Sequence, residues 1–340
     1  MVRYIGARLG TALVSIVGIA LVVFLITQLL PGDAARVQAG QYATQEQIDA
    51  LRTRFGLDRP VIVQLGDYFW HLLHIDLGES TRTSQPVLSE LMQRLPATLE
   101  LSLLALIIAL VIGIVLGTLA ASDRGRIGDG IIRVYTVLSS STATFWIALL
   151  AIFLFSNVLG WFPNPTGRLP RGFDEPDHVT GMFVLDGVLT GNLESSWGAL
   201  RTLALPAILL GIVTSPSILK VVRSSTIRAL DSDYTRTARM FGYSKPSILF
   251  RDGLRNSLLP VVTTIGIVIG YLLGGNIIIE QLFSWPGIGQ YAFLAVQAHD
   301  LSALRGFALL VGVIYVLINT TLDIVYVLID PRVQAQAVSR

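Results

Sequence analysis

Six long apolar runs constrain the fold of this chain more than any other feature of its sequence. Each has about 20 residues or more, enough for an α-helix rising 1.5 Å per residue to cross about 30 Å of hydrocarbon. A helix also satisfies its backbone polar groups within one segment, as a bilayer requires. The sequence therefore predicts an all-α integral membrane protein with six transmembrane helices, at roughly residues 9–30, 99–121, 131–158, 203–222, 257–279 and 306–329.

Composition agrees with this class and excludes several others. The chain is 52% apolar and 14% charged, and its mean hydropathy is +0.64. A net charge of +2 is too small to indicate a nucleic-acid partner. The absence of cysteine excludes disulfides, thiolate metal sites and thiol catalysis, and four scattered histidines give no sign of a metal site.

The N-terminus resembles a signal peptide, because Arg3 and Arg8 precede an apolar run. That run, 9–30, is longer than the apolar region of a typical signal peptide and lacks a small-residue cleavage site. We therefore interpret residues 1–30 as an N-terminal region with a first membrane helix.

Positive charge in the short loops predicts the orientation. Arg124 and Arg126 lie between the second and third runs, with Arg133 at the start of the third, and a larger basic set lies between the fourth and fifth, whereas the fifth-to-sixth loop has only Arg305. Both termini are therefore expected on the cytoplasmic side of the membrane. Three tryptophans near the outer ends are expected as interfacial anchors: Trp161, Trp197 and Trp285.

Two long connections, 31–96 and 159–202, are placed outside the membrane by this orientation. In the first, Thr44 and Gln47 form a capping box for a helix that Gly56 would end. The second is rich in proline, glycine and acidic residues. Both are expected to fold, and neither contains a recognisable catalytic set.

Stripes of glycine mark two of the runs. Gly266, Gly270 and Gly274 share one helix face, and Gly113 and Gly117 have the same spacing. Small residues let membrane helices approach closely. Packing within this chain and packing against a partner subunit are both consistent with the pattern.

A basic segment, Lys220 to Arg255, interrupts the apolar sequence with eight of the 25 basic residues. Asp231 or Asp233 can cap a short helix within it, and Gly242 can end that helix in a left-handed turn. A second helix then starts near Ser244 and leads into the fifth run. A loop that only fixes topology would explain the charge, but it would need no helix–glycine–helix pattern.

The string "RTARMFGYSKPSILFRDGLRNSLLP" at 236–260 resembles the cytoplasmic loop of ABC importer permeases, which is named after its Glu-Ala-Ala sequence. Arg236–Thr237–Ala238 stand at the Glu-Ala-Ala positions, with Gly242 as the characteristic glycine and Leu259–Pro260 at the end. The missing glutamate and the longer spacing from Gly242 to Pro260 resemble the oligopeptide, dipeptide and nickel subgroup.

Further strings in family order extend the resemblance over nearly the whole chain, as expected for the B-type permease subunit of dipeptide and oligopeptide importers. They are "LLPGD" at 29–33, "FGLDRP" at 55–60, "IDLGES" at 75–80, "RLPATLELSLLAL" at 94–106, "EQLFSWPGIGQ" at 280–290 and "DPRV" at 330–333. The resemblance implies a type I ABC importer permease fold. In it, an external segment, 31–96, precedes a five-helix core, 97–340, that contains the cytoplasmic loop 223–256.

The resemblance also implies roles for individual residues. The short helix would be a coupling helix that docks on an ATP-binding subunit through Asp233, Tyr234, Thr235, Arg236, Thr237, Ala238, Arg239, Met240, Phe241 and Gly242. The translocation path, or the packing around it, would involve Ser140, Ser141, Thr142, Gly266, Gly270 and Gly274. An outer gate would be formed near Trp285, Pro286 and Gly287.

The energy source is expected outside this chain. Neither of the two lysines, Lys220 and Lys245, lies in a GxxxxGK[ST] phosphate loop, so no ATP hydrolysis by that route is expected here. Of the acidic residues, only Asp323 falls clearly within a run, toward its inner end, which argues against a self-sufficient ion-coupled carrier. A membrane enzyme would need a converging catalytic set, and none is seen.

The expected assembly contains a second homologous permease, two cytoplasmic ATP-binding subunits that hold ATP and Mg²⁺, and an extracytoplasmic substrate-binding protein. The lipid membrane surrounds it, and no cofactor is expected in this chain. Di- or oligopeptides are the first expected substrate, with a nickel chelate or another small solute as the alternative.

Overall fold

The structure is a computed structural model that describes residues 2–29, 43–54, 58–122 and 124–329. The strings "LLPGD" and "DPRV" and the expected helix end at Gly56 lie wholly or mostly outside these residues. Within them every regular element is a helix, which confirms the all-α class. The helices are α1 (Val2–Leu29), α3 (Gln45–Arg54), α4 (Val61–Leu73), α5 (Val87–Ser122), α6 (Ile127–Ser141), α7 (Thr144–Ala151), η1 (Ile152–Val158), α8 (Phe183–Leu189), α9 (Leu193–Leu230), α10 (Asp233–Met240), α11 (Lys245–Ser247), η2 (Ile248–Leu254), α12 (Arg255–Gly275), α13 (Ile277–Leu282), α14 (Ile288–Gln297) and α15 (Leu301–Ile329).

Four helices are long and apolar enough to cross a membrane: α1, α5, α9 and α15. The fifth predicted run corresponds to α12, whose apolar part, Pro260–Gly274, is shorter. The outer helix α3 begins with the predicted capping box, because the Gln47 amide donates to Thr44 Oγ1 at 3.4 Å and the Thr44 amide donates to Gln47 Oε1 at 3.0 Å.

The third predicted run, 131–158, is not one straight helix. It consists of α6 followed by α7 with η1, and the two parts meet at an angle of 101°. The break lies at Thr142 and Ala143, which both have extended backbones. Just before it, Ser140 and Thr142 donate their hydroxyls to the carbonyls of Thr136 and Leu138 at 2.7 Å. Such bonding to the preceding turn bends helices slightly, but it also occurs at Thr136 where α6 is unbroken, so the break itself depends on the extended backbones of Thr142 and Ala143.

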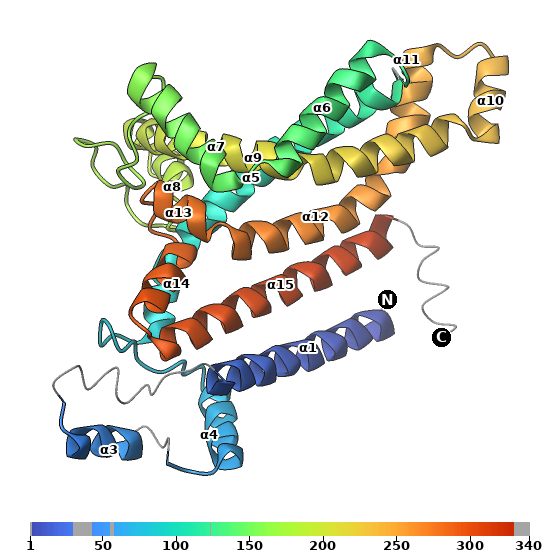
Figure 1. Ribbon diagram of the computed structural model, residues 1–340. Coiled ribbons are helices and arrows are strands. Elements are labelled where there is room, and N and C mark those ends of the chain that lie inside the picture. Colours follow the sequence, from blue (N-terminus) through green and yellow to red (C-terminus); the bar gives the residue numbers. More distant parts are fainter. Residues whose placement is uncertain (1, 30–42, 55–57, 123, 330–340) are drawn as a thin grey trace.

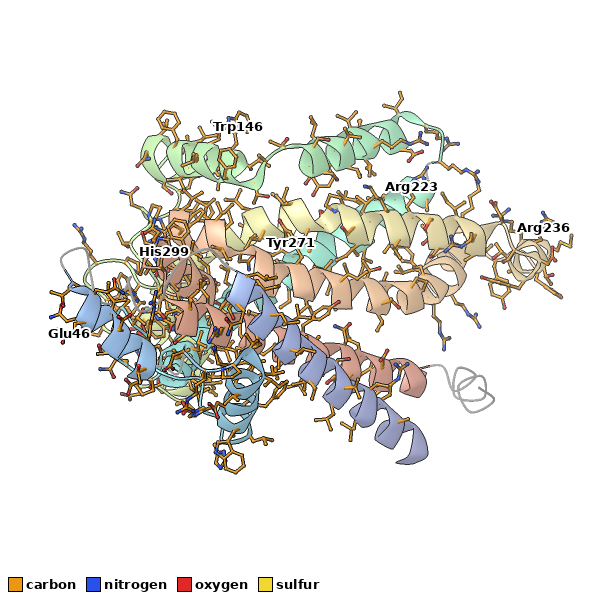
Figure 2. The ribbon with its side chains drawn as sticks, turned by 60° about the horizontal axis from the view of Figure 1, so that its bottom comes forward. Glu46, Trp146, Arg223, Arg236, Tyr271 and His299 are labelled. Atoms are coloured by element: carbon orange, nitrogen blue, oxygen red, sulfur yellow. The ribbon has the colours of Figure 1, made fainter. Side chains whose placement is uncertain are left out.

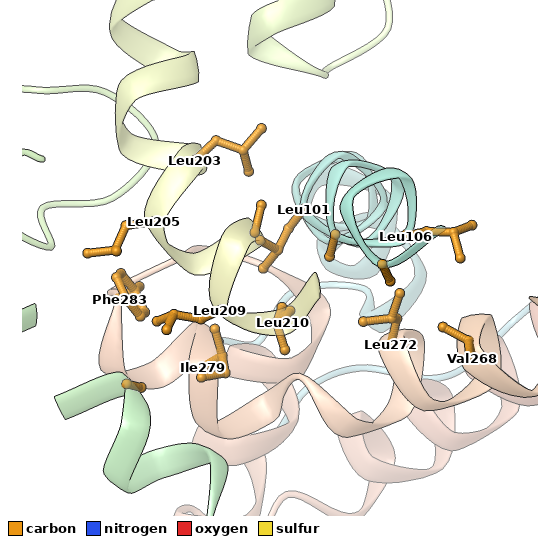
Figure 3. Close-up of a cluster of buried hydrophobic side chains, with 14 of the residues drawn as sticks. Leu101, Leu106, Leu203, Leu205, Leu209, Leu210, Val268, Leu272, Ile279 and Phe283 are labelled. Atoms are coloured by element: carbon orange, nitrogen blue, oxygen red, sulfur yellow. The ribbon is translucent and has the colours of Figure 1, made fainter. Parts of the chain in front are cut away.

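The core lies along α5 and α9, which run side by side (Figure 1). Glycines allow this close approach: a Cβ on Gly113 would lie 2.7 Å from Ile218, and one on Gly117 would lie 2.8 Å from Val222. Gly211 of α9 meets Ile108 of α5 in the same way, at 2.5 Å. The surrounding cluster is drawn in Figure 3 and includes Leu101, Leu203, Leu210 and Leu272, each no more than 2% exposed.

The glycine stripe of α12 faces α15 of the same chain. A Cβ on Gly266 would lie 2.8 Å from Asn319, and one on Gly270 would lie 2.5 Å from the Tyr315 ring. Gly274 is looser, with Val311 at 3.9 Å. The sequence was consistent with packing of this stripe within the chain or against a partner subunit, and the structure shows packing within the chain.

The connecting helices gather at two opposite ends of the long helices (Figure 1). At one end, α10 and α11 join α9 to α12; at the other lie α8, α13 and α14. The outer pair α1 and α15 is tied near the first end by an ion pair of 3.0 Å between Arg8 and Asp323. Near the second end, Arg305 Nε donates to Thr27 Oγ1 at 2.8 Å.

We predict opposite effects of alanine at two glycines in long helices. Alanine favours a helix by about 1 kcal/mol over glycine, so Gly18→Ala, which meets no atom within 4 Å, should keep or raise the melting temperature. Gly113→Ala should lower it, because overpacking against Ile218 costs about 1–3 kcal/mol. Thermal unfolding of the detergent-solubilised variants tests this, and equal melting temperatures would show that α5 and α9 are not closely packed there.

Candidate functional site

The candidate coupling helix α10 crosses the end of α9, as Figure 1 shows. Its N-cap is Ser232, not Asp231 or Asp233 as the sequence suggested. Ser232 Oγ donates to the Ala229 carbonyl at 2.5 Å, which holds the chain at the end of α9. Asp231 instead closes α9 and pairs with Arg124 at 3.1 Å, and Asp233 begins α10.

Two side chains anchor α10 to the last turn of α9. Thr235 is fully buried and donates its hydroxyl to the Ala229 carbonyl at 2.8 Å. Arg239 donates to the Leu230 carbonyl at 3.2 Å. Thr235 was predicted with the docking residues, but the structure makes it an internal anchor, because its small side chain lies beneath the helix.

The outward face of α10 carries large apolar side chains at its C-terminal end. Met240 is 86% exposed and Phe241 is 78% exposed, which is unusual for side chains of this size. Arg236 also lies on the surface, at the far end of the molecule (Figure 2), where it pairs with Asp233 at 3.4 Å. The surface of α10 thus combines exposed apolar groups with arginine.

The predicted glycine stop is confirmed. Gly242 has φ +78°, a left-handed conformation that glycine adopts at little cost. The turn is closed by amides that donate backward, from Gly242 to Arg239 at 3.0 Å and from Tyr243 to Ala238 at 3.2 Å. It reverses the chain into α11 and η2, which continue into α12, so both ends of α10 connect to long helices.

A buried carboxylate joins α6 to α9 at this end of the molecule. Asp129 is 1% exposed and accepts hydrogen bonds from Arg223 Nε and Nη2, both at 3.0 Å, and from Arg133 Nη2 at 2.7 Å. The Gly125 amide adds a fourth at 3.2 Å. Arg223 lies in the basic loop, but sequence reasoning did not single out Asp129. Its signal was its place between Arg126 and Arg133 at the start of an apolar run.

The segment 280–290 at the opposite end forms a buried, closely packed cluster, which we name the Glu280 cluster. Trp285 is 1% exposed and donates its indole N–H to the Ala97 carbonyl at 2.9 Å. The prediction that it is an interfacial anchor is therefore wrong, whereas Trp161 and Trp197 are exposed. Gly287 lies so close to Thr98 and Glu280 that a Cβ would overlap them, and Pro286 is half-buried.

Glu280 lies at the centre of this cluster and has no exposed surface. Its carboxylate accepts the Thr98 hydroxyl at 2.6 Å and the Gln290 amide at 2.8 Å, at the start of α14. Burial raises the pKa of Glu280 to about 7, against hydrogen bonds from Thr98, Gln290 and Gly289 that lower it. The group joins α5, α13 and α14 through one side chain.

Three other buried carboxylates hold the connecting segments in place at this end. Glu100 of α5 accepts Arg168 Nη2 and the Val184 amide, both at 2.7 Å. Asp300 accepts the Ser80 hydroxyl at 2.6 Å. The third, Asp186, lies within its own segment, where burial raises its pKa but the Thr180 hydroxyl and the amides of the 179–181 turn donate to it and lower the pKa overall. Sequence reasoning noted the acids of these segments but not their partners.

The two predicted sets of path residues do not meet. Ser140, Ser141 and Thr142 lie at the break after α6, whereas the glycines of α12 face α15. Figures 1 and 2 show α9 between α6 and α12. Among the described residues, no cluster of three or more histidine, aspartate or glutamate side chains is arranged to hold a metal ion.

We predict a pH-dependent contribution of Glu280 to stability. Because its pKa in the folded protein, about 7, lies above the ordinary 4.5, protonation favours the folded state. That contribution is complete below about pH 4.5 and is lost as the pH rises through about 7. Melting temperatures measured from pH 5 to 8 should therefore fall more steeply for the wild type than for Glu280→Gln. Exposed Glu46→Gln is the control, and parallel curves for wild type and Glu280→Gln would contradict the prediction.

Comparison with known proteins matches nearly the whole chain to one family of transport proteins. The family model of the binding-protein-dependent transport system inner membrane component matches residues 113–335, and the model of its N-terminal region matches residues 1–102. A probable D,D-dipeptide transport system permease protein of Escherichia coli is 42% identical over 94% of this chain and 93% of its own length. A di/tripeptide transport system permease protein of Pseudomonas aeruginosa is 38% identical over 99% of this chain and all of its own.

A dipeptide transport system permease protein of Alkalihalophilus pseudofirmus is 36% identical over 98% of this chain and all of its own length. Each match spans nearly all of this chain and of the relative, so it covers the apolar helices as well as the loop with α10. With its helical fold, its membrane-spanning helices and these matches, the chain belongs to the family of binding-protein-dependent transport system inner membrane components, the permease subunits of ABC importers with the type I fold.

Proposed function

We propose that this protein is the permease subunit of an ATP-driven importer of di- and oligopeptides. The observation that carries the proposal is α10, a short helix held at the end of α9 with Met240 and Phe241 exposed, in a chain of this family. The names of the similar permeases support peptides as the substrate class. Import of a nickel chelate by the same kind of subunit is the alternative.

The coupling role of α10 follows from its attachment. A helix that transmits movement must be short, rigid and joined at both ends to elements that move. Thr235 and Arg239 fasten α10 to α9, and the Gly242 turn links it through η2 to α12. Met240 and Phe241 would insert into an apolar groove of a cytoplasmic ATP-binding subunit, while Arg236 pairs with acidic residues at its rim.

The ATP and Mg²⁺ belong to those partner subunits, and this chain takes no part in hydrolysis. A second homologous permease would complete the path across the membrane. The basic loop fixes the orientation, with α10 and both termini on the cytoplasmic side of a bacterial plasma membrane. The opposite end, with segments 31–96, 159–202 and 280–303, would receive an extracytoplasmic binding protein.

The outer gate is proposed at the Glu280 cluster, which includes Trp285. There, hydrogen bonds join α5, α13 and α14 into one unit, so this end would move as a rigid body. The path itself would run along the surface of α6 near its break, where the hydroxyls of Ser140 and Thr142 interrupt an apolar face. ATP binding would favour one arrangement of the two ends through contacts that the other arrangement lacks.

We predict that the exposed end of α10 carries the docking energy. Truncation of a large apolar anchor at an interface costs about 2 kcal/mol or more. The double variant Met240→Ala/Phe241→Ala should therefore bind the ATP-binding subunits at least about thirtyfold more weakly. The measurement is the amount of these subunits that co-purifies with this chain when all are co-expressed and this chain carries the tag. Ile127→Ala, at an 84% exposed position at the same end, is the matched control.

The same preparations distinguish docking from folding. The double variant should keep the wild-type melting temperature, because both side chains lie on the surface. Retention of the ATP-binding subunits by the double variant would reject α10 as the docking element. Loss of these subunits from the Ile127→Ala control as well would show that docking is spread over this whole end.

We predict that the assembled transporter hydrolyses ATP faster when its binding protein is loaded with a dipeptide. Proteoliposomes containing all subunits should also accumulate labelled dipeptide only when ATP is present on the α10 side. A nickel–histidine complex supplied in place of the peptide is the parallel trial. Uptake of the nickel complex alone would assign this subunit to the alternative substrate, and uptake without ATP would reject the importer.

A further inference from the structure

A cavity of about 480 Å³ lies between α6 and α9, beside the Asp129 contact, and no role has been given to it above. Its size falls in the range of sites for small molecules. It opens on the surface of the molecule near Arg223, which Figure 2 shows between the two helices. The lining residues are Ile132, Arg133, Thr136, Val137, Leu219, Lys220 and Arg223.

The charges in this cavity do not balance. Arg133 and Arg223 share the one buried carboxylate of Asp129. Lys220 is exposed and has no ion-pair partner in the described part of the chain. Three cations against one carboxylate leave a charge of about +2, so the cavity favours an anionic occupant.

The cations lie at the membrane boundary. In α9, Lys220 and Arg223 end the predicted apolar run and precede the last turns before α10. At 1.5 Å per residue, they lie about 10–15 Å from the end of α9. The 38 residues of α9 span about 57 Å, well beyond about 30 Å of hydrocarbon, so its end projects into water. The cations therefore lie near the lipid headgroups.

Apart from Thr136, the rest of the lining is apolar and continues onto an exposed apolar surface. Ile132, Val137 and Leu219 line the cavity, and on α6 Ile131 and Val134 are also largely exposed. An occupant that matches both parts carries an anionic head and a hydrocarbon chain. A free phosphate matches only the cations, and a neutral lipid matches only the apolar wall.

We propose that this cavity binds an anionic phospholipid of the leaflet next to α10, with its phosphate at Lys220, Arg133 and Arg223 and an acyl chain along Val137 of α6. In the orientation proposed above, this is the cytoplasmic leaflet, whose anionic lipids attract basic residues at the boundary. The lipid would cover the apolar surface of α6 only as far as Val137, before the hydroxyls of Ser140 and Thr142 assigned to the path, and would bridge α6 to α9 beside the Asp129 contact.

A photocrosslinker identifies the occupant directly. Benzoylphenylalanine placed at Val137, which is 62% exposed, should form a lipid adduct when the co-expressed transporter is irradiated in native membranes. Mass spectrometry of the labelled peptide should show an anionic glycerophospholipid. An adduct to another protein subunit, or to neutral lipid alone, would overturn the proposal.

A charge variant tests the headgroup contact in the purified protein. One lysine near an anionic surface contributes about 1 kcal/mol, so Lys220→Gln should retain phosphatidylglycerol about fivefold more weakly in native mass spectrometry. Lys245→Gln removes the same charge from the same end outside the cavity and should retain the lipid as the wild type does.

Two results of the second experiment would overturn the proposal. One is equal loss of phosphatidylglycerol from Lys220→Gln and Lys245→Gln, which would indicate a diffuse charge effect. The other is complete displacement of the lipid by millimolar inorganic phosphate, which would indicate an ion site without an acyl contact. Neither reading depends on transport, so failure here leaves the coupling role of α10 untouched.

Discussion

The close contact between α5 and α9 is the interaction on which the rest of the structure depends. Within a bilayer, helices gain little from hydrophobic burial, so they associate through packing and through the approach of small residues. Gly113, Gly117 and Gly211 bring the two backbones together over several turns. Because each helix is longer than the membrane is thick, this contact also carries both ends of the protein into water. The two functional ends are built on these projecting turns.

At both ends, buried charges fix the connecting segments to this pair of helices. A buried carboxylate needs hydrogen bonds to offset its lost hydration. Asp129 obtains them from two arginines, and Glu280 obtains them from a hydroxyl and the amides that begin α14. In each case the donors come from separate helices, so satisfying the charge also sets the positions of these helices. The membrane centre is left largely apolar.

Local features of the sequence were sufficient for much of this structure. The apolar runs predicted the long helices, Thr44 and Gln47 predicted a capped helix, and Gly242 predicted the stop after α10. Each depends on neighbours within a few residues. The contacts that were missed join distant positions: 94 residues separate Asp129 from Arg223, and 182 separate Thr98 from Glu280. A single sequence holds no pattern that pairs such positions.

The wrong predictions have the same origin. Trp285 has the composition and place of an interfacial anchor, and only its hydrogen bond to Ala97 of α5 shows that it points inward. Hydroxyl residues are common in straight membrane helices, so the sequence at 139–144 did not indicate whether the helix would continue or bend. The choice depends on the backbone at Thr142 and Ala143.

This arrangement separates a stiff part of the molecule from a part that can move. The α5–α9 pair and the Glu280 cluster are held together by close packing and by buried hydrogen bonds. By contrast, α6 and α7 meet at a break and expose most of their apolar surface, and α6 is held to α9 by Asp129 at its first turn and by Tyr135 and Ser139 near its end. Movement imposed on α10 would enter the rigid pair directly through α9. The break at Thr142 and Ala143 would then be the place where an angle can change, because α6 is carried by α9 and α7 is carried by the core through Ala148 and Ala151, and a change of angle is the property required of a wall that lines a path.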